Sequence, residues 1–243
     1  MKKFIIIASQ RTGSNMLVST LRSHADIECH GELFRKKKKH FKGGVRVFSQ
    51  LDERFQQEEY LMEHWREFLE LVIQHGKESG ASAVGFKIMM NQSELVRGSL
   101  IEDESWTKIL LKRENVLAVY SSNKIAKATG QGSAGKFAEV EKSQVAFEAG
   151  EFKRFCAKYE EGFDKVKRQL ADCGQDYLDT QYSEICKPEG MKALIGYLGL
   201  DPEAGWEVST QKRNPSQLLE RFTNPTEVSR YLDKIGRPGW AVE

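Results

Sequence analysis

Phe4-Ile-Ile-Ile-Ala-Ser-Gln-Arg-Thr-Gly-Ser-Asn-Met-Leu-Val18 contains three successive patterns near the start of the chain. Residues 4–8 are apolar and rich in β-branched side chains, which is typical of a strand buried on both faces of a parallel sheet. Residues 9–15 are mostly small and polar, and from Met16 onwards apolar residues recur at helical spacing. A strand, a short loop and a helix in this order direct backbone N–H groups towards an anion.

We interpret residues 9–15 as a phosphate-binding loop, to which Arg11 adds a positive charge. The loop departs from the nucleotidase motif G-x-x-x-x-G-K-[ST], because a second Gly and the Lys are missing. An ordinary strand-to-helix turn is the alternative interpretation, and the local pattern alone leaves it open.

The composition favours one α/β domain over residues 1–243. Of the 243 residues, 40% are hydrophobic and 30% are charged, which is enough for a sizeable core. The net charge of +2 argues against a general nucleic-acid-binding protein, in which a strongly basic face is expected.

Neither a signal sequence nor a membrane span is predicted. Lys2 and Lys3 precede a short apolar run, but Gln10 and Arg11 interrupt it before it reaches the length of a signal sequence. No other stretch approaches the roughly 18 apolar residues required to cross a membrane. A cytoplasmic protein is therefore expected.

Cysteine and histidine spacing predicts no metal site. The cysteines lie far apart without a C-x-x-C pair, so reduced structural thiols are expected rather than a zinc site or a disulfide framework. They are Cys29, Cys156, Cys173 and Cys186. The histidines also lack metal-ligand spacing, and they are His24, His30, His40, His64 and His75.

Apolar runs alternate with amphipathic segments along the rest of the chain. Further strands are predicted at residues 27–30, 83–89, 108–112 and 177–182. Helices are predicted at residues 55–74, 116–130, 152–170, 191–198 and 224–235. This alternation predicts a central, mostly parallel sheet with helices on both faces.

Ligands of open parallel sheets bind beyond the carboxyl ends of the strands. Segments that follow predicted strands would bring Arg11, Glu32 and Arg113 towards one edge. Two arginines and a phosphate-binding loop suit a ligand with several anionic groups, and a lone carboxylate suits a general base. His30 is the rival base, while a solvated loop acid at Glu32 and a surface ion pair at Arg113 are the simpler alternatives.

Several of these segments, taken together, resemble one family. They are Gln-Arg-Thr-Gly-Ser-Asn-Met-Leu (10–17), Cys-His-Gly-Glu-Leu-Phe (29–34), Val-Gly-Phe-Lys-Ile-Met-Met-Asn (84–91), Arg113 with Ser121, and Gln-Lys-Arg-Asn-Pro (211–215). The set is similar to the bacterial carbohydrate sulfotransferases, the group that contains trehalose and nodulation-factor sulfotransferases. The resemblance covers most of the chain, and residues 130–150 match least.

This resemblance implies a P-loop-like three-layer fold and the donor 3′-phosphoadenosine-5′-phosphosulfate, without a metal. The family's 5′-phosphosulfate loop maps onto Arg11, Thr12, Gly13, Ser14 and Asn15. Its 3′-phosphate motif maps onto Arg113 and Ser121, its proposed base onto Glu32, and a weaker cofactor contact onto Lys212 and Arg213. Many eukaryotic relatives carry Lys where this chain has Arg11, so a role for Arg11 in stabilising the leaving group is an analogy.

The resemblance therefore implies in-line transfer of a sulfuryl group to a hydroxyl of a carbohydrate or glycolipid, with adenosine 3′,5′-bisphosphate as product. Glu32 would accept the hydroxyl proton, and Arg11 would stabilise charge on the departing phosphate. A P-loop nucleotide-dependent kinase and a non-catalytic nucleotide-binding protein are the alternatives. The acceptor and the oligomeric state stay open.

Two further segments have an unusual composition, one rich in lysine and one rich in glycine. Lys36-Lys-Lys-Lys39 is expected to be a solvated face, or a contact for an anionic acceptor because it follows Glu32 closely. The glycine-rich residues 130–135 have no helix-forming pattern and are expected to form a lid or a loop at the site mouth.

Overall fold

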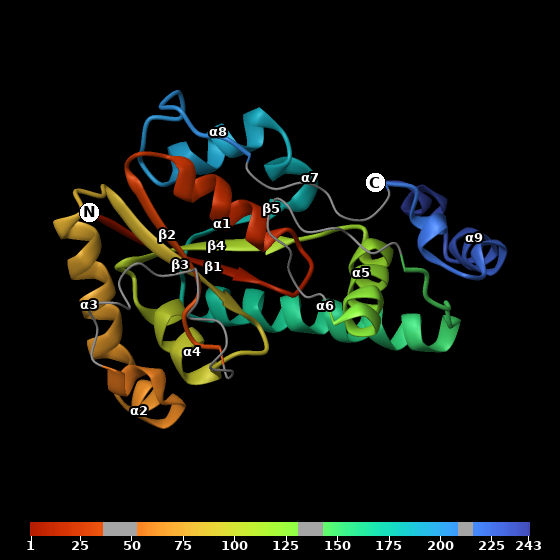
Figure 1. Ribbon diagram of the computed structural model, residues 1–243, viewed down its shortest axis with the longest axis horizontal. Coiled ribbons are helices and arrows are strands. Elements are labelled where there is room, and N and C mark those ends of the chain that lie inside the picture. Colours follow the sequence, from red (N-terminus) through yellow and green to blue (C-terminus); the bar gives the residue numbers. More distant parts are fainter. Residues whose placement is uncertain (36–52, 131–142, 209–215) are drawn as a thin grey trace.

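A computed structural model describes residues 1–35, 53–130, 143–208 and 216–243 (Figure 1). The predictions for Lys36 to Lys39, for residues 131–135 and for Lys212 and Arg213 lie outside the described residues.

The centre of the fold is a five-stranded sheet in the order β2-β3-β1-β4-β5, with every neighbouring pair parallel. Its strands are β1 (Lys2–Ala8), β2 (Ile27–Glu32), β3 (Ala83–Met89), β4 (Trp106–Lys112) and β5 (Tyr177–Gln181). The α/β fold with a parallel sheet is thus confirmed, and each predicted strand is present. Strand β1 lies in the middle of the sheet, and its residues 4–8 are buried, as their continuous apolar run predicts.

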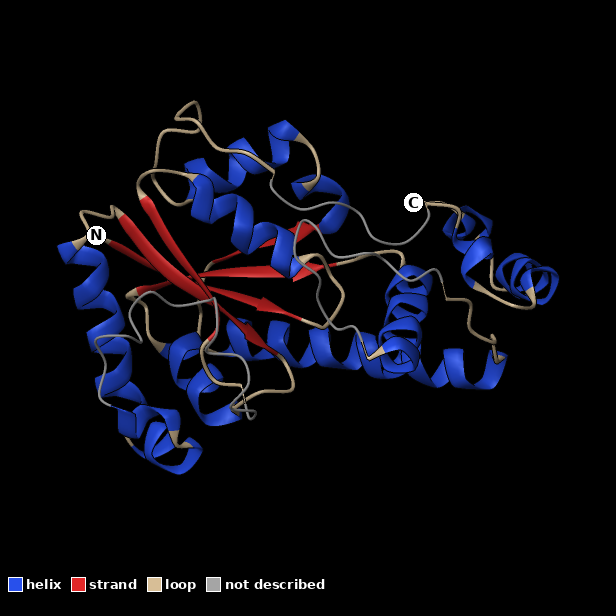
Figure 2. Ribbon diagram, in the orientation of Figure 1, coloured by secondary structure: helices blue, strands red, loops and turns tan. Residues whose placement is uncertain are grey.

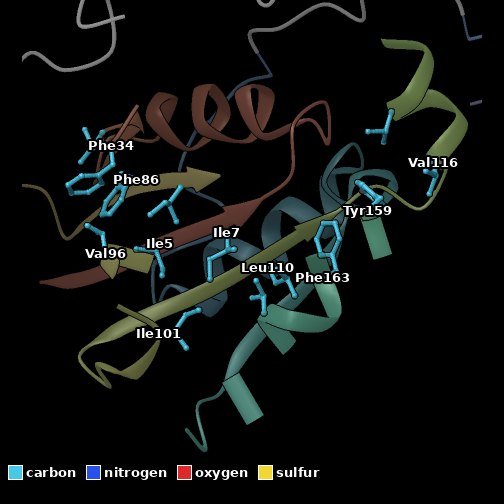
Figure 3. Close-up of a cluster of buried hydrophobic side chains, with 14 of the residues drawn as sticks. Ile5, Ile7, Phe34, Phe86, Val96, Ile101, Leu110, Val116, Tyr159 and Phe163 are labelled. Carbon is cyan, nitrogen blue, oxygen red and sulfur yellow. The ribbon is translucent and has the colours of Figure 1, made fainter. Parts of the chain in front are cut away.

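Helices cover both faces of the sheet (Figures 1 and 2). Helices α1 (Ser14–Ser23), α7 (Tyr182–Ile185) and α8 (Pro188–Tyr197) pack on one face, and α3 (Trp65–Glu78), α4 (Glu94–Glu102) and α6 (Ala149–Asp172) on the other. Alternate residues of β1 point to opposite faces of the sheet. Phe4 and Ile6 pack against α1, α7 and α8, and Ile5 and Ile7 lie in the core on the side of α3, α4 and α6. Figure 3 shows this second core, where Ile5, Ile7 and Leu110 lie near aromatic side chains from α6.

A helix follows the carboxyl end of β4 directly. Helix α5 (Val116–Thr129) begins where the Asn115 carboxamide accepts a hydrogen bond from the Ala118 amide at 3.2 Å, and it ends at Gly130, whose φ is 68°. Helix α9 (Pro225–Lys234) starts with the Pro that the sequence predicts at its first turn. Short 3₁₀ segments are η3 (Glu53–Gln56), η4 (Leu218–Arg221) and η5 (Pro238–Ala241).

The end of the chain packs against α5. Asn115 donates from Nδ2 to the carbonyl oxygens of Trp240 and Val242, at 3.2 and 3.3 Å. On the same side, the buried Tyr120 and Phe222 rings stack with their centroids 6.3 Å apart. These contacts bring η4 and the last residues to the carboxyl end of β4, far from them in sequence.

The single helix predicted at residues 55–74 is wrong in detail. The segment forms η3, α2 (Glu58–Glu63) and α3, and the two α-helices meet at His64, whose φ and ψ are −108° and 28°. The bend contains no Gly or Pro, and the Tyr60 ring stacks on the His64 ring there, with the two centroids 4.2 Å apart. Helix α4 was not predicted, although Ser93 caps it by accepting a hydrogen bond from Val96 at 3.3 Å.

Candidate active site

The segment between β1 and α1 has an unusual backbone. Among the described residues, Arg11 is the one residue other than Gly with a positive φ, 65°, and Gly13 has a φ of 86°. Inside the loop, the Thr12 hydroxyl donates to the Ser9 carbonyl at 2.8 Å and is fully buried. Helix α1 then starts at Ser14, so its first amides lie at the carboxyl end of β1, where an anion would be held.

Gly13 is required by two independent constraints. Its positive φ disfavours any residue with a side chain, and a Cβ atom there would lie 2.3 Å from Cδ2 of Tyr182. Tyr182 follows β5 directly, and its ring forms one wall of the loop. Burial raises the pKa of Tyr182 to about 12, and the neighbouring Cys186 acts in the same direction.

Arg11 and Arg113 meet at this edge of the sheet, as the sequence predicts. The Arg113 side chain donates from Nη1 to the main-chain carbonyl of Arg11 at 2.8 Å. The Arg11 side chain donates from Nε to the Ser122 hydroxyl on α5 at 2.7 Å. The loop after β1 is therefore tied to the segment after β4 by both arginines.

Arg113 holds a carboxylate in this structure. Its Nε donates to Oε1 of Glu243 at 2.6 Å, and its Nη2 donates to Oε2 of the same side chain. The guanidinium also stacks on the Tyr182 ring, 4.3 Å from the ring centroid. Because a fork of two N–H groups on two oxygens is the geometry of carboxylate and phosphate recognition, this position suits an oxyanion.

Ser121 lies beside a third arginine that the sequence analysis did not find. Its hydroxyl accepts from Nη1 of Arg221 at 3.1 Å and donates to the Ala118 carbonyl at 3.2 Å. Burial and, next, the charge of Arg113 together lower the pKa of Arg221 to about 10. We call Arg11, Arg113 and Arg221 the arginine cluster; Glu243 is the carboxylate bonded within it.

Glu32 lies at the end of β2, where a bulge shifts the register between His30 and Glu32. Its Oε2 accepts from Nε2 of Gln92 at 2.7 Å, and its Oε1 is 3.4 Å from Nζ of Lys87. A bulge at a strand end redirects a side chain, and here it accompanies the approach of Glu32 to Lys87.

Lys87 connects Glu32 to the loop after β1. It is only 3% exposed, and its Nζ donates to Oδ1 of Asn15. Burial lowers the pKa of Lys87, while the charge of Glu32 opposes this effect. Lys87 lies in a segment that the sequence predicts only as a buried strand. A single Lys inside an apolar strand indicates a buried charge that needs a partner, and this pattern could have identified it.

His30, the rival base, is directed elsewhere. Its Nε2 is 3.2 Å from Oε1 of Glu28, whose carboxylate also lies 3.0 Å from Nδ1 of His75 on α3. Burial raises the pKa of Glu28, but His30, Ser79 and His75 together outweigh it and lower the value to about 2. His30 thus belongs to a buried cluster with Glu28 rather than to the contacts of Glu32.

Within the described ranges, no group of three or more His, Cys, Asp or Glu side chains could hold a metal ion. No helix in the described part of the chain has the length and apolar character to cross a membrane.

Comparisons with known proteins give three similar solved structures. A sulfotransferase from Alicyclobacillus acidocaldarius is 15% identical with a TM-score of 0.45, and it covers 99% of this chain and 98% of that one. The sulfotransferase domain of the Synechococcus PCC 7002 olefin synthase is 15% identical with a TM-score of 0.43, covering 98% and 94%. The sulfotransferase domain from the curacin biosynthetic pathway is 14% identical with a TM-score of 0.44, covering 97% and 98%. No family model and no curated protein matches the chain.

Proposed function

We propose that this protein is a sulfotransferase that transfers a sulfuryl group from 3′-phosphoadenosine-5′-phosphosulfate to a hydroxyl of a small-molecule or glycan acceptor. The observation that carries the proposal is the pairing of two different sites at one sheet edge. The arginine cluster holds an oxyanion, and Glu32 is held by Lys87 and Gln92 beside the loop that follows β1.

The arginine cluster supports a donor with more than one anionic group. Its three guanidinium groups gather many N–H donors and positive charges in one place, which suits a ligand with several anionic groups. Arg113 and Ser121 would hold the 3′-phosphate, with Arg221 as an additional contact. The bond pattern of Glu243 on Arg113 is what a phosphate oxygen pair would need.

The loop after β1 would hold the 5′-phosphosulfate. Backbone N–H groups at the start of α1 and the Arg11 guanidinium would contact it, with Thr12, Gly13, Ser14 and Asn15 shaping the loop. Lys212 and Arg213 are proposed further contacts. The donor supplies the sulfuryl group and the phosphate that departs from it.

Glu32 would take the proton of the acceptor hydroxyl. A sugar hydroxyl is too weakly acidic to attack unaided, so a positioned base is required as the new bond forms. Gln92 donates to one carboxylate oxygen and Lys87 lies 3.4 Å from the other, which fixes the orientation of Glu32. Arg11 would stabilise the negative charge that grows on the departing phosphate, and positioning supplies much of the remaining catalysis.

The test combines a transfer assay with Glu32→Gln. The full chain is incubated with the labelled donor and a panel of glycans and small alcohols, and sulfated products are detected by mass. We expect Glu32→Gln to lower turnover about 10²–10⁴-fold while binding of adenosine 3′,5′-bisphosphate stays unchanged. Glu28→Gln is the matched control on the same strand, and its turnover should stay near that of the unchanged protein because Glu28 contacts His30 and His75 instead.

Other results would favour other functions. Near-normal turnover in Glu32→Gln would transfer the role of base to His30. Tight binding of adenosine 3′,5′-bisphosphate without transfer to any acceptor would indicate a non-catalytic binding protein. Mg²⁺-dependent ATP consumption would indicate a kinase.

A further inference from the structure

The main chain of Arg113 is held by a side chain from α6. The Tyr159 hydroxyl accepts a hydrogen bond from the Arg113 amide at 3.0 Å and donates one to the Arg113 carbonyl, also at 3.0 Å. Tyr159 lies 46 residues further along the chain, and Figure 3 shows it near the carboxyl end of β4. One hydroxyl thus bonds both polar groups of the main chain of one residue.

The position of Arg113 explains why such a contact is needed. The register between β4 and β1 ends at Leu111, and the register between β4 and β5 ends at Lys112. Arg113 is buried and lies in the short link between β4 and α5. The regular bonds of a strand or a helix do not extend through a link of this kind, so a side chain has to satisfy its buried main-chain groups.

Tyr159 is suited to this task because it is itself held in place. It is 6% exposed, and its ring centroid lies 5.0 Å from that of Phe163 and 6.3 Å from that of Phe155. Burial raises the pKa of its hydroxyl, so the group stays protonated near neutral pH and can donate to the Arg113 carbonyl. Because the side chain is buried and bonded to Arg113, its influence on a ligand would pass through Arg113.

The direction of the Arg113 side chain follows from the main chain that Tyr159 holds. The guanidinium reaches the Arg11 carbonyl at 2.8 Å and lies 4.3 Å from the centroid of the Tyr182 ring. Ser121, the other residue assigned to the 3′-phosphate, lies further along on α5. A rotation of the Arg113 backbone would therefore move the guanidinium away from these contacts and change its distance from Ser121.

We propose that Tyr159 is a positioning residue for the 3′-phosphate of the donor, because it fixes the Arg113 backbone so that the guanidinium faces that group. The inference rests on the proposed function, since it takes Arg113 as the contact of the 3′-phosphate. Loss of the Tyr159 hydroxyl weakens nucleotides that carry a 3′-phosphate and leaves those that lack it unchanged. Tyr159 thus controls selectivity for this group rather than affinity in general.

The test compares adenosine 3′,5′-bisphosphate with adenosine 5′-monophosphate by isothermal titration calorimetry of the full chain. Tyr159→Phe keeps the ring in the core and removes the hydroxyl, and thermal unfolding shows that the variant is folded at the temperature used. We expect its affinity for the bisphosphate to fall about tenfold and its affinity for the monophosphate to stay within about twofold.

Tyr120→Phe is the matched control. The Tyr120 hydroxyl is also part of a buried side chain, donates to Oε2 of Glu151 at 2.9 Å and accepts from Nζ of Lys124 at 3.3 Å. Its removal should cost similar stability and leave both affinities unchanged. Equal losses for the two nucleotides in Tyr159→Phe, or the same loss of selectivity in Tyr120→Phe, would overturn the inference.

A double variant separates positioning from a general loss of stability. In the Arg113→Gln background, Tyr159→Phe should weaken the bisphosphate no further, because the guanidinium that it positions is gone. Additive losses would overturn the inference. If the unchanged protein binds both nucleotides equally, the donor of the proposed function is refuted, and the role of Tyr159 with it. If it prefers the bisphosphate and Tyr159→Phe keeps that preference, only the role of Tyr159 is refuted.

Discussion

The two halves of the candidate active site differ in the charged groups that they bring together and in where those groups come from. Near β2 and β3, in the Glu32 half, Glu32 faces Lys87, and both groups come from neighbouring strands. Near β4 and α5, in the arginine half, three arginines lie close to Glu243, and these residues come from distant parts of the chain. The Glu32 half suits a proton acceptor with a fixed orientation, whereas the arginine half suits a ligand with several negatively charged groups.

Lys87→Met should have the largest effect of the variants compared below and tests the Glu32 half. It leaves Glu32 without its cation and removes the hydrogen bond to Asn15, so we expect turnover to fall about 10²-fold. Turnover is measured with saturating donor and acceptor, after thermal unfolding has shown that the variant is folded.

Lys108→Met is the matched control for this prediction. Lys108 is a buried lysine on β4, but its Nζ donates to the Asp103 carbonyl at 2.8 Å and to Gln175, away from Glu32. Its replacement should cost stability and leave the turnover of folded protein nearly unchanged. An equal loss of turnover in both variants would show that Lys87 matters only for folding.

Arg113→Gln tests the arginine half. It removes the two-pronged contact and the bond to the Arg11 carbonyl, so affinity for adenosine 3′,5′-bisphosphate should fall about 30-fold, equivalent to about 2 kcal/mol. Isothermal titration calorimetry measures it, with Arg66→Gln as the exposed control. Unchanged affinity would remove Arg113 from the donor site.

Gly13→Ala tests the close contact between the loop after β1 and the Tyr182 ring. The positive φ and the close approach of Tyr182 should lower the free energy of unfolding by about 1–2 kcal/mol and weaken bisphosphate binding. Chemical denaturation measures the change. Gly98→Ala is the matched control, since no atom lies within 4 Å of its Cβ position in α4, and it should be neutral or stabilising.

Glu243→Gln should have the smallest effect, with the opposite sign. The carboxylate competes with a ligand for Arg113, so removing its charge should raise bisphosphate affinity about threefold. Calorimetry at low salt gives the clearest reading, and Asp233→Asn on α9 is the control. Lower affinity in Glu243→Gln would mean that this carboxylate supports the site instead of competing for it.

The same comparison explains what the sequence could predict. Arg11 and Arg113 follow strands of one parallel sheet and Glu32 is the last residue of another, so a local rule places them at one edge. Arg221 and Glu243 follow no strand, and they reach the site because Phe222 and the last residues pack on α5. Long-range packing of this kind leaves no periodic signal in the sequence.

Local errors in the fold have related causes. Helix α4 has a weak apolar pattern in which Arg97 occupies a buried position, so the helix resembles a polar loop in sequence. The bend at His64 contains no helix-breaking residue, so the sequence carries no local signal for it. The roles of Glu32, Arg11 and the loop residues stay predictions until the variants above are measured.

The left-handed backbone at Arg11 places two separate demands on one position. The fold would tolerate Gly and Asn there most easily and β-branched residues least, since a side chain at positive φ costs roughly 1–2 kcal/mol. The proposed chemistry instead requires a long cationic side chain, which only Arg or Lys provides. Position 11 is thus a place where selection for a stable protein and selection for an active one would choose different amino acids.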